Sequence, residues 1–371
     1  MADMRFDKTH MSKNRISLDA VAKAANTSVG TVDRALNNRG RINDETKQKI
    51  IRIAKELGYR SHSVASALGR QNAMRLAVIM PQKPHDFCDG MVLGCKAALG
   101  DLRDFGIQAD FLFTDSLDPL EQENLLQTMD VARYAGIAIN AGGDILSPYI
   151  NSFIDRGIPV VTFNSDIADS RRLLFVGNDA FDSGCLAGEL MARMLHREVK
   201  PLKIAAMAGF EGVRSHMRRR DGFLHVMQRE CRELERVMLL HYQDSAEKAE
   251  RTTLELLQEH PDMDGLFYTS APGAIGAGNA LKKTGLQRFP VVIGYDVSDT
   301  VAAHVRSGTC TALIHQDPYR QGYYGVKLLA RHLLEKWQPD AQEFLIRSKL
   351  VMQYNLADYL VENERHQRIL E

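Results

Sequence analysis

The sequence predicts a chain of two parts: an all-α head with a helix-turn-helix, and an α/β body of two lobes, each a doubly wound parallel sheet. Three observations predict this architecture. Three short amphipathic helices fall within residues 16–60, apolar strands alternate with helical segments from Met74 onward, and this alternating series occurs twice. At 371 residues and 44% hydrophobic content, the chain is too long for one typical domain and can bury large cores.

Two helices joined by a short turn open the head. The apolar residues of the first helix keep the i, i+3, i+4, i+7 spacing of one buried face, and they are Leu18, Val21, Ala22 and Ala25. Ser17 and Ser28 are the expected N-caps of the two helices. The second helix buries Val32, Ala35 and Leu36, which leaves a face open to solvent or a ligand. That face carries Val29, Gly30, Thr31, Asp33 and Arg34.

A third helix should complete the core of the head. Asn43 is its expected N-cap, and Gly58 is the expected stop. Its buried residues are predicted to be Ile50, Ile53, Ala54 and Leu57.

The charge of the chain is unevenly distributed. Residues 1–75 carry fifteen Lys and Arg against seven Asp and Glu, a net charge of +8, so the remainder carries −8 because the total is zero. A basic module suits a partner of dense negative charge, since Lys and Arg that meet phosphates release counterions. A solvated charged face is the plainer explanation of the charge alone, and the helix pattern argues against it.

Three segments of the head, VAKAANTSVGTVDRALN, INDETKQKIIRIAKELGYR and SVASALGR, resemble the amino-terminal signature of the lactose-repressor and galactose-repressor family of bacterial transcription regulators. The resemblance covers the head residue by residue, and the order of elements in the remaining chain fits the same family. It implies a periplasmic-binding-protein-like body and a repressor that binds a near-palindromic double-stranded DNA operator as a homodimer. Operator affinity would be controlled by a small ligand bound between the two lobes.

The resemblance also implies which head residues bind DNA. They are Ser28, Val29, Gly30, Thr31, Arg34, Asn37, Arg39 and Leu68, with Leu68 as a wedge in the minor groove. The head departs from the family pattern at two positions. Asp33 replaces a small hydroxyl residue and could repel phosphate or accept from a cytosine amino group, and Ser61 replaces a proline.

We expect a disordered tail at 1–14, the helix-turn-helix domain at 15–60, a hinge helix and linker at 61–74, the effector-binding domain at 75–357 and a C-terminal tail at 358–371. The family resemblance places three hinge strands near 178–179, 316–317 and 339–342. Lobe one would then comprise 75–178 and 317–340, and lobe two 179–316 and 341–356. Asn363 and Gln367 interrupt the heptad leucines of the tail, so we expect no tetramerising coiled coil.

The apolar runs of the body predict its strands. Four runs lie at 75–80, 107–113, 136–140 and 159–163, and five more at 202–208, 236–242, 264–270, 290–296 and 310–316. Helices are expected to begin near Asp89, Pro119, Ile145, Arg214, Ala246, Pro272, Val297 and Pro318. Ligands in such sheets bind beyond the carboxyl ends of the strands, so the residues that follow the apolar runs should line a cleft between the lobes.

Those residues are mostly polar. The predicted effector-binding set is His85, Phe87, Asn164, Arg219, Ser270, Asp296 and Gln316. Resemblance to ribose-type binding proteins and sugar-sensing repressors implies that the acid, the amides and Arg219 bind hydroxyls and that Phe87 stacks on a sugar face. Plainer roles remain open: Asp296 or Asp179 as a helix cap, and Phe87 or Trp337 as packing. A sugar or polyol is the favoured effector, followed by a sugar phosphate and then a purine.

Other classes of protein find little support. Five scattered cysteines without CxxC spacing argue for a reducing compartment and no metal site. We find no catalytic motif and no dinucleotide pattern with an acidic partner, which predicts a protein that is not an enzyme and needs no cofactor. Residues 1–14 do not resemble a signal peptide, and no apolar stretch could span a membrane, so a cytoplasmic location without a membrane partner is expected. The alternative is a sugar-binding receptor without a DNA role.

Overall fold

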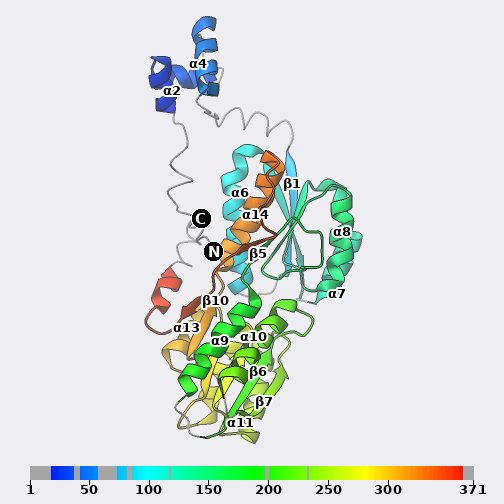
Figure 1. Ribbon diagram of the computed structural model, residues 1–371, viewed down its shortest axis with the longest axis vertical. Helices are drawn as coiled ribbons and strands as arrows, with labels where there is room; N and C mark the ends of the chain where they lie inside the picture. Colours follow the sequence, from blue (N-terminus) through cyan, green and yellow to red (C-terminus); the bar gives the residue numbers. More distant parts are fainter. Residues whose placement is uncertain are drawn as a thin grey trace. The chain divides into compact units, whose positions relative to one another are not determined.

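The structure is a computed structural model that describes residues 18–36, 42–56, 73–81, 86–116, 118–196, 200–231 and 234–361. The chain divides into two compact units, one containing the head and the other containing nearly all of the body (Figure 1). The all-α head and the two-lobed α/β body confirm the predicted fold class.

The head consists of three helices, α2 (Leu18–Ala25), α3 (Val29–Leu36) and α4 (Asp44–Glu56). Ser28 Oγ accepts a hydrogen bond from the Thr31 amide at 3.2 Å, and Asn43 Oδ1 accepts one from the Glu45 amide at 2.9 Å, so both predicted N-caps are confirmed. The buried residues come from all three helices and are Val21, Ala22, Ala25, Val32, Ala35, Ile50 and Ala54. Ser17, Leu57 and Gly58 lie outside the described residues, as do the tail at 1–14 and the hinge helix.

Lobe one is built on a six-stranded sheet with the strand order β11-β5-β4-β3-β1-β2. Its strands are β1 (Met74–Pro81), β2 (Ile107–Thr114), β3 (Gly136–Ile139), β4 (Val160–Phe163), β5 (Leu174–Gly177) and β11 (Glu343–Leu345). Helices α6 (Asp86–Leu102) and α14 (Pro318–Glu335) lie on one side of the sheet, and α7 (Pro119–Thr128) and α8 (Ser147–Asp155) lie on the other (Figure 1). Three short 3-10 turns accompany them, at Arg103–Phe105, Val131–Arg133 and Asp144–Leu146.

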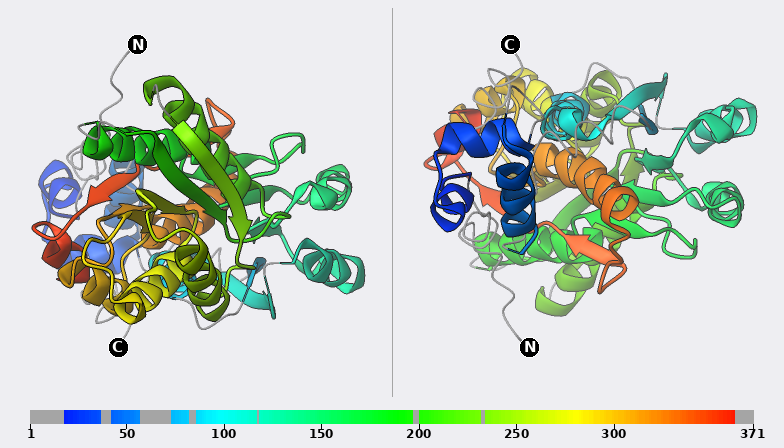
Figure 2. Two further views of the ribbon diagram at one scale, coloured as in Figure 1. Left: turned by 90° about the horizontal axis from the view of Figure 1, so that it is seen from below. Right: turned by 90° about the horizontal axis from the view of Figure 1, so that it is seen from above.

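Lobe two repeats the design with the strand order β12-β10-β9-β8-β6-β7. Its strands are β6 (Leu202–Ala208), β7 (Leu234–His241), β8 (Gly265–Tyr268), β9 (Val291–Tyr295), β10 (Ala312–His315) and the antiparallel β12 (Lys349–Val351). Helices α9 (Ala180–Leu195) and α10 (Arg214–Glu230) cover one face (Figure 2). Helices α11 (Ala246–Glu259), α12 (Ala271–Thr284) and α13 (Asp299–Arg306) pack into the core of the other face.

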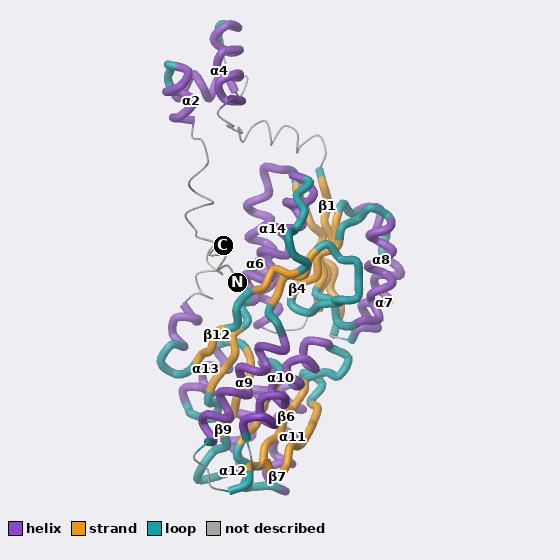
Figure 3. Tube along the Cα trace, in the orientation of Figure 1, coloured by secondary structure: helices purple, strands orange, loops and turns teal. Residues whose placement is uncertain are grey.

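The inner strands of the lobe-two sheet, β6, β8, β9 and β10, are buried on both faces, which explains their continuous apolar runs. Alternate residues of one strand serve different cores: Ala205 and Met207 pack with α11 and α12, whereas Ile204 and Ala206 pack with α9 and α10. The strands therefore lie between two helical layers (Figure 3).

Three connections join the lobes, and one buried glutamine binds them together. Gln321, on the first turns of α14, donates to Asn178 Oδ1 at 2.8 Å and to the Gln316 carbonyl oxygen at 3.0 Å. Asn178 in turn donates to the Ile346 carbonyl oxygen at 2.6 Å. The predicted crossings near 178–179 and 316–317 agree with the strands on either side of them.

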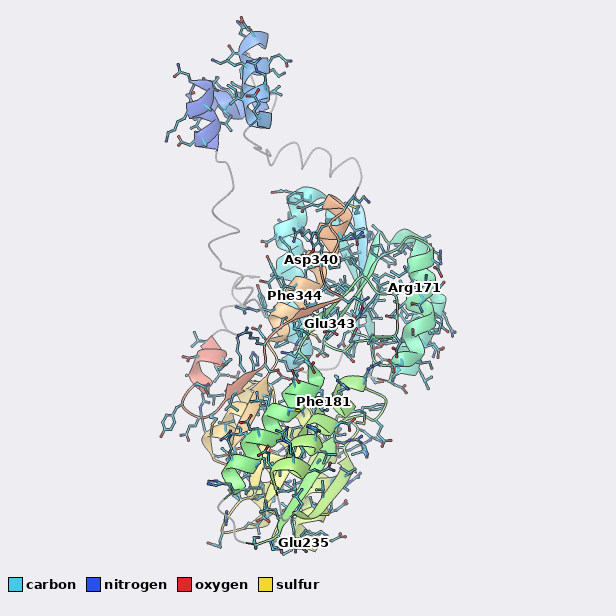
Figure 4. The ribbon with its side chains drawn as sticks, viewed as in Figure 1. Arg171, Phe181, Glu235, Asp340, Glu343 and Phe344 are labelled. Carbon is cyan, nitrogen blue, oxygen red and sulfur yellow. The ribbon has the colours of Figure 1, made fainter. Side chains whose placement is uncertain are left out.

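The third crossing was predicted too early, and the lobe boundary between 340 and 341 is wrong. Residues Glu343–Leu345 form β11, which pairs in parallel with β5 of lobe one. Phe344, labelled in Figure 4, packs against Tyr324 of α14 with ring centroids 4.9 Å apart. The chain therefore crosses between Leu345 and Lys349. An edge strand of three residues with two exposed side chains carries no apolar run, so no periodic pattern predicts it.

Candidate functional site

A cavity lies between the lobes, at the carboxyl ends of both sets of strands. Lobe one lines it with Phe87 and with polar residues Asn140, Asn164 and Ser165. Lobe two supplies His216, Arg219, Asp244, Ser270 and Asp296. Arg214, the first residue of α10, forms an ion pair with Asp144 of lobe one at 2.9 Å.

Three buried side chains, those of Arg219, Gln316 and Asp296, form a hydrogen-bonded array on the lobe-two side of the cavity. Gln316 donates from its backbone amide to Asp296 Oδ1 at 3.0 Å and from Nε2 to Asp296 Oδ2 at 2.6 Å. Its Oε1 accepts from Arg219 Nη2, while Arg219 Nη1 donates to the Thr269 carbonyl oxygen at 2.8 Å. The guanidinium carbon lies 4.5 Å from the centre of the Tyr295 ring. Arg219 and Asp296 are therefore held as a fixed donor and acceptor pair by the amide between them.

The lobe-one wall is an amide pair on a fixed loop. Asn164 Nδ2 donates to Asn140 Oδ1 at 3.3 Å. Gln122 of α7 holds the loop after β3, because it donates to the Asn140 carbonyl oxygen at 2.8 Å and accepts from the Gly142 amide at 2.7 Å. Both amides are thereby presented to the cavity by elements of the core.

Three buried polar atoms of the cavity lining have no hydrogen-bond partner among the residues that the structure describes: Arg219 Nε, Asn164 Oδ1 and Ser165 Oγ. Buried polar atoms are nearly always hydrogen-bonded, since an unmet group costs about 1–3 kcal/mol. These atoms come from both lobes and comprise a donor, an acceptor and a hydroxyl that can do either. They are suited to a ligand whose groups donate and accept at closely spaced positions.

The backbone of this region is strained in a way that selects Asn and Asp. Asn164, Asp244 and Asp296 have φ angles of 65°, 51° and 60°, in the left-handed region. Asn and Asp tolerate this region better than other residues with a Cβ, and such strain concentrates at functional sites.

Burial also raises the pKa of Asp296 above the usual 3.8, although His315 and Arg219 oppose the shift. Burial likewise raises the pKa of Tyr295 to about 12.

The structure places five of the seven predicted effector-binding residues in the cavity lining: Phe87, Asn164, Arg219, Ser270 and Asp296. Gln316 is not among the lining residues; it lies behind Arg219 and Asp296 and holds both. His85 lies outside the described residues.

The structure decides three of the four plainer roles that the sequence left open, those of Asp296, Asp179 and Trp337. Ser298, whose Oγ accepts from the Val301 amide, caps α13, so Asp296 is not that helix's cap. Asp179 does cap α9. Trp337 packs beneath the guanidinium of Arg331, at 4.6 Å.

Five polar residues of the lining were not in the predicted set: Asn140, Ser165, Ser215, His216 and Asp244. Asn140 directly follows the β3 run, so the rule used for Asn164 and Asp296 could have found it. Asp244 lies three residues beyond the end of β7, and His216 lies in the first turn of α10. No apolar run ends at these two residues, and only the folded backbone brings them to the cavity.

In the head, the N-terminal half of α3 presents the face predicted to bind DNA. Val29 has 43% of its surface exposed, and a Cβ on Gly30 would meet nothing closer than Ser28 Oγ at 4.0 Å. Arg34 is exposed, and its Nε donates to the Gly30 carbonyl oxygen at 3.1 Å. This hydrogen bond does not involve the two Nη groups at the end of the side chain. Asn37, Arg39 and Leu68 lie outside the described residues.

Comparison with known families agrees with both parts of the chain. Residues 17–62 match the family described as bacterial regulatory proteins, lacI family, and residues 76–336 match the periplasmic binding protein domain. The chain belongs to the lacI family of bacterial regulatory proteins. Proteins of this family bind DNA and are not enzymes. The family therefore argues against the alternative of a sugar-binding receptor without a DNA role.

Curated relatives cover most of this family member. The "Probable HTH-type transcriptional repressor ExuR" of Bacillus subtilis is 27% identical over 288 residues, which is 76% of this chain and 81% of the relative. The "Ribose operon repressor" of Halalkalibacterium halodurans is 26% identical over 337 residues, or 90% of this chain and 94% of the relative.

Solved structures resemble the body alone. A carbohydrate transporter solute binding protein from Agrobacterium radiobacter, in complex with D-arabinose, aligns with a TM-score of 0.71 at 23% identity, covering 78% of this chain and 98% of the other. A solute binding protein from Bacillus halodurans with bound myo-inositol aligns with a TM-score of 0.70 at 21% identity and the same coverage. At this identity the likeness establishes the fold. Among the described residues, every helix is too short or too polar to cross a lipid bilayer.

Proposed function

We propose that this regulator is a repressor that binds DNA as a homodimer. Its affinity for the operator would fall or rise when a sugar or polyol binds between the lobes. One head reads only a few base pairs, so two heads related by a two-fold axis would bind a near-palindromic operator. The net charge of +8 over residues 1–75 supports contact with phosphates. Such a protein acts where the DNA is, in the bacterial cytoplasm.

The observation that carries the ligand site is the set of unpartnered polar atoms in the cavity. Arg219 Nε, Asn164 Oδ1 and Ser165 Oγ are buried, come from both lobes and need partners of different kinds. A hydroxyl both donates and accepts, so neighbouring hydroxyls of a sugar or polyol could satisfy all three. Phe87, also in the lining, offers an apolar surface for the C–H face of such a ligand.

Binding to both walls couples the ligand to the angle between the lobes. A ligand that bridges Asn164 of lobe one and Arg219 of lobe two favours the closed arrangement over an open one. Closure changes the orientation of lobe one relative to lobe two. Along the chain, the head is followed by β1, the first strand of lobe one. Coupling free energies of this type are typically about 1–3 kcal/mol, equivalent to a change of roughly 5- to 150-fold in operator affinity.

The test uses the full chain and a random pool of DNA duplexes. Selection should enrich a near-palindromic sequence whose affinity falls steeply with salt, and at least one member of a panel of sugars and polyols should change that affinity fivefold or more. No enriched sequence would contradict the DNA role. An enriched operator that no member of the panel affects would contradict the ligand role.

Arg34 provides the matched variant for the head. Arg34→Ala should weaken operator binding by roughly 1–3 kcal/mol and leave sugar binding unchanged, because Arg34 extends from the predicted recognition face. Arg52→Ala removes the same charge from α4, where Arg52 lies near Glu56, and serves as the control. Equal losses in both variants would mean that Arg34 contributes only its charge.

A further inference from the structure

The hydroxyl of Ser270 is already bound inside the protein, to a carboxylate. Ser270 Oγ donates to Asp244 Oδ1 at 2.5 Å, and the Tyr242 hydroxyl lies 2.7 Å from Ser270 Oγ. A serine hydroxyl has one proton to donate in a hydrogen bond. Ser270 donates it to Asp244, so the donor in the hydrogen bond between Tyr242 and Ser270 must be the Tyr242 hydroxyl. The hydrogen bonds thus run in one direction, from Tyr242 through Ser270, and end at Asp244.

The position of Asp244 is fixed from several sides. Asp244 is only 5% exposed, and its backbone amide donates to the Gly209 carbonyl oxygen at 2.9 Å. Gly209 leaves the space that this carboxylate needs, because a Cβ there would lie 2.9 Å from Asp244 Oδ1 and 2.8 Å from His216 Nδ1. Thr269 holds Gly209 in place by accepting from its amide at 3.0 Å. A carboxylate held in this way lines the cavity without being part of the Arg219–Gln316–Asp296 array.

We propose that Asp244 is a second carboxylate that accepts effector hydroxyls, and that Ser270 and Tyr242 are positioning residues for it. The inference rests on the proposed role of the cavity as the effector site. It replaces the expected contact between Ser270 and the effector with a contact through Asp244, because the only proton of Ser270 is committed.

A second carboxylate determines the class of ligand. Among the described lining residues, Arg219 is the only Lys or Arg, while Asp244 and Asp296 are both acids. Arg219 is linked through Gln316 to Asp296, which leaves Asp244 to face the ligand with no arginine or lysine of the lining beside it. An anionic group at this wall would be repelled, whereas a hydroxyl would donate to the carboxylate. The site therefore selects an uncharged sugar or polyol over a sugar acid or a sugar phosphate.

Matched ligands test the selection on the full-length protein. Calorimetry would compare neutral, acidic and phosphorylated members of each series: D-ribose with ribose 5-phosphate, D-galactose with galacturonate and galactose 6-phosphate, and myo-inositol with its monophosphate. The neutral member of the series that binds best should bind at least tenfold more tightly than its charged counterparts. A tighter acid or phosphate would overturn the inference. Binding by no member would contradict the proposed sugar site itself, and the inference with it.

Variants test the roles of the two residues against the best-binding neutral probe. Asp244→Asn keeps the shape but replaces an acceptor with a donor, and it should weaken binding tenfold or more. Ser270→Ala should weaken binding several-fold, and Ser270→Thr, which keeps a hydroxyl, should restore most of the affinity. Asp299→Asn, an exposed acid on α13, is the matched control and should bind as wild type does.

Combining the variants separates positioning from direct contact. If Ser270 acts through Asp244, adding Ser270→Ala to Asp244→Asn should cost nothing further. Losses that multiply would show that Ser270 binds the ligand independently and would overturn its positioning role; wild-type affinity in Asp244→Asn would overturn the inference. Thermal unfolding without ligand checks that each variant folds. If Asp244→Asn does not fold, Tyr242→Phe removes the first donor from outside the cavity and should weaken binding two- to fivefold, with no change refuting the relay.

Discussion

Replacing Gln316 with Met should weaken effector binding without a direct contact to the effector being lost. The substitution keeps the length of the side chain and removes both polar atoms of the amide. Arg219 Nη2 then loses its acceptor and Asp296 Oδ2 loses its donor. These two residues are 4% and 6% exposed, so water cannot readily replace the amide.

The magnitude follows from the two hydrogen bonds. A hydrogen bond to a charged group is worth about 1.5–3 kcal/mol, so losing two of them should cost the variant about 3–6 kcal/mol of folding stability. A typical domain has about 5–15 kcal/mol, so we expect Gln316→Met to fold with a lower melting temperature. The released Arg219 and Asp296 side chains should no longer be held for the ligand, and affinity should fall at least tenfold, equivalent to about 1.4 kcal/mol.

The assay is calorimetry with the neutral probe, paired with thermal unfolding of the ligand-free protein. Gln287→Met, at an exposed amide of the same lobe, is the matched control and should leave both quantities unchanged. A Gln316→Met protein that loses stability but binds the probe with wild-type affinity would refute the reasoning. The array would then support the fold alone.

Three further predictions concern single residues. Burial raises the pKa of Asp296 above 3.8, so the folded protein holds this proton more tightly than the unfolded chain; the stability it contributes is present below pH 3.8 and is lost as pH rises through the folded-state pKa. Asp296→Asn should therefore gain stability relative to wild type as pH rises, in unfolding experiments from pH 3 to 8, while losing sugar affinity; a difference independent of pH would contradict this. Gly184→Ala should cost about 1–3 kcal/mol on thermal unfolding and reduce sugar affinity, because its Cβ would lie 2.0 Å from the Arg219 carbonyl oxygen; wild-type stability would mean that α9 and α10 separate at no cost. Ser28→Ala should cost the head about 1 kcal/mol and weaken operator binding in gel shifts, because the Thr31 amide loses its cap; Ser28→Asn, another capping residue, should restore much of the stability, and failure to do so would point away from capping.

The fold followed from the sequence wherever a buried face repeats with a regular period. The runs that became β6 and β9 are buried on both sides, and the apolar spacing of Val21 and Ala25 describes the core face of α2, so local pattern and tertiary environment agree there. β5, β11 and β12 were not among the predicted strands. β5 has only four residues, and β11 and β12 are strands of three residues at a sheet edge, which are too short to show a periodicity.

By residue pattern alone, the candidate site was predictable where polar residues directly follow strands, whereas Arg219, inside α10, was predicted from the family resemblance. Asn164 and Asp296 obey that rule and line the cavity. The rule says nothing of which way a side chain turns, so Gln316, which also follows a strand, was expected in the lining and instead lies behind it. Asp244 reaches the cavity through a left-handed backbone three residues past β7, a conformation that depends on Gly209 and the loop around it.

The amide of Gln321 gives the two lobes a common axis. Its Nε2 serves Asn178 and the Gln316 backbone together, and Asn178 passes the connection to Ile346, so all three crossings are bound to one another at one buried place. Loose connections would let the lobes slide or twist independently of the cleft. Crossings tied at one place restrict them to rotation about that place, and a small closing movement at Asn164 and Arg219 becomes a larger displacement of atoms farther from the axis. Binding of a small sugar can then displace the start of β1 by moving an entire lobe. No continuous chain of side-chain contacts between the cavity and β1 is needed.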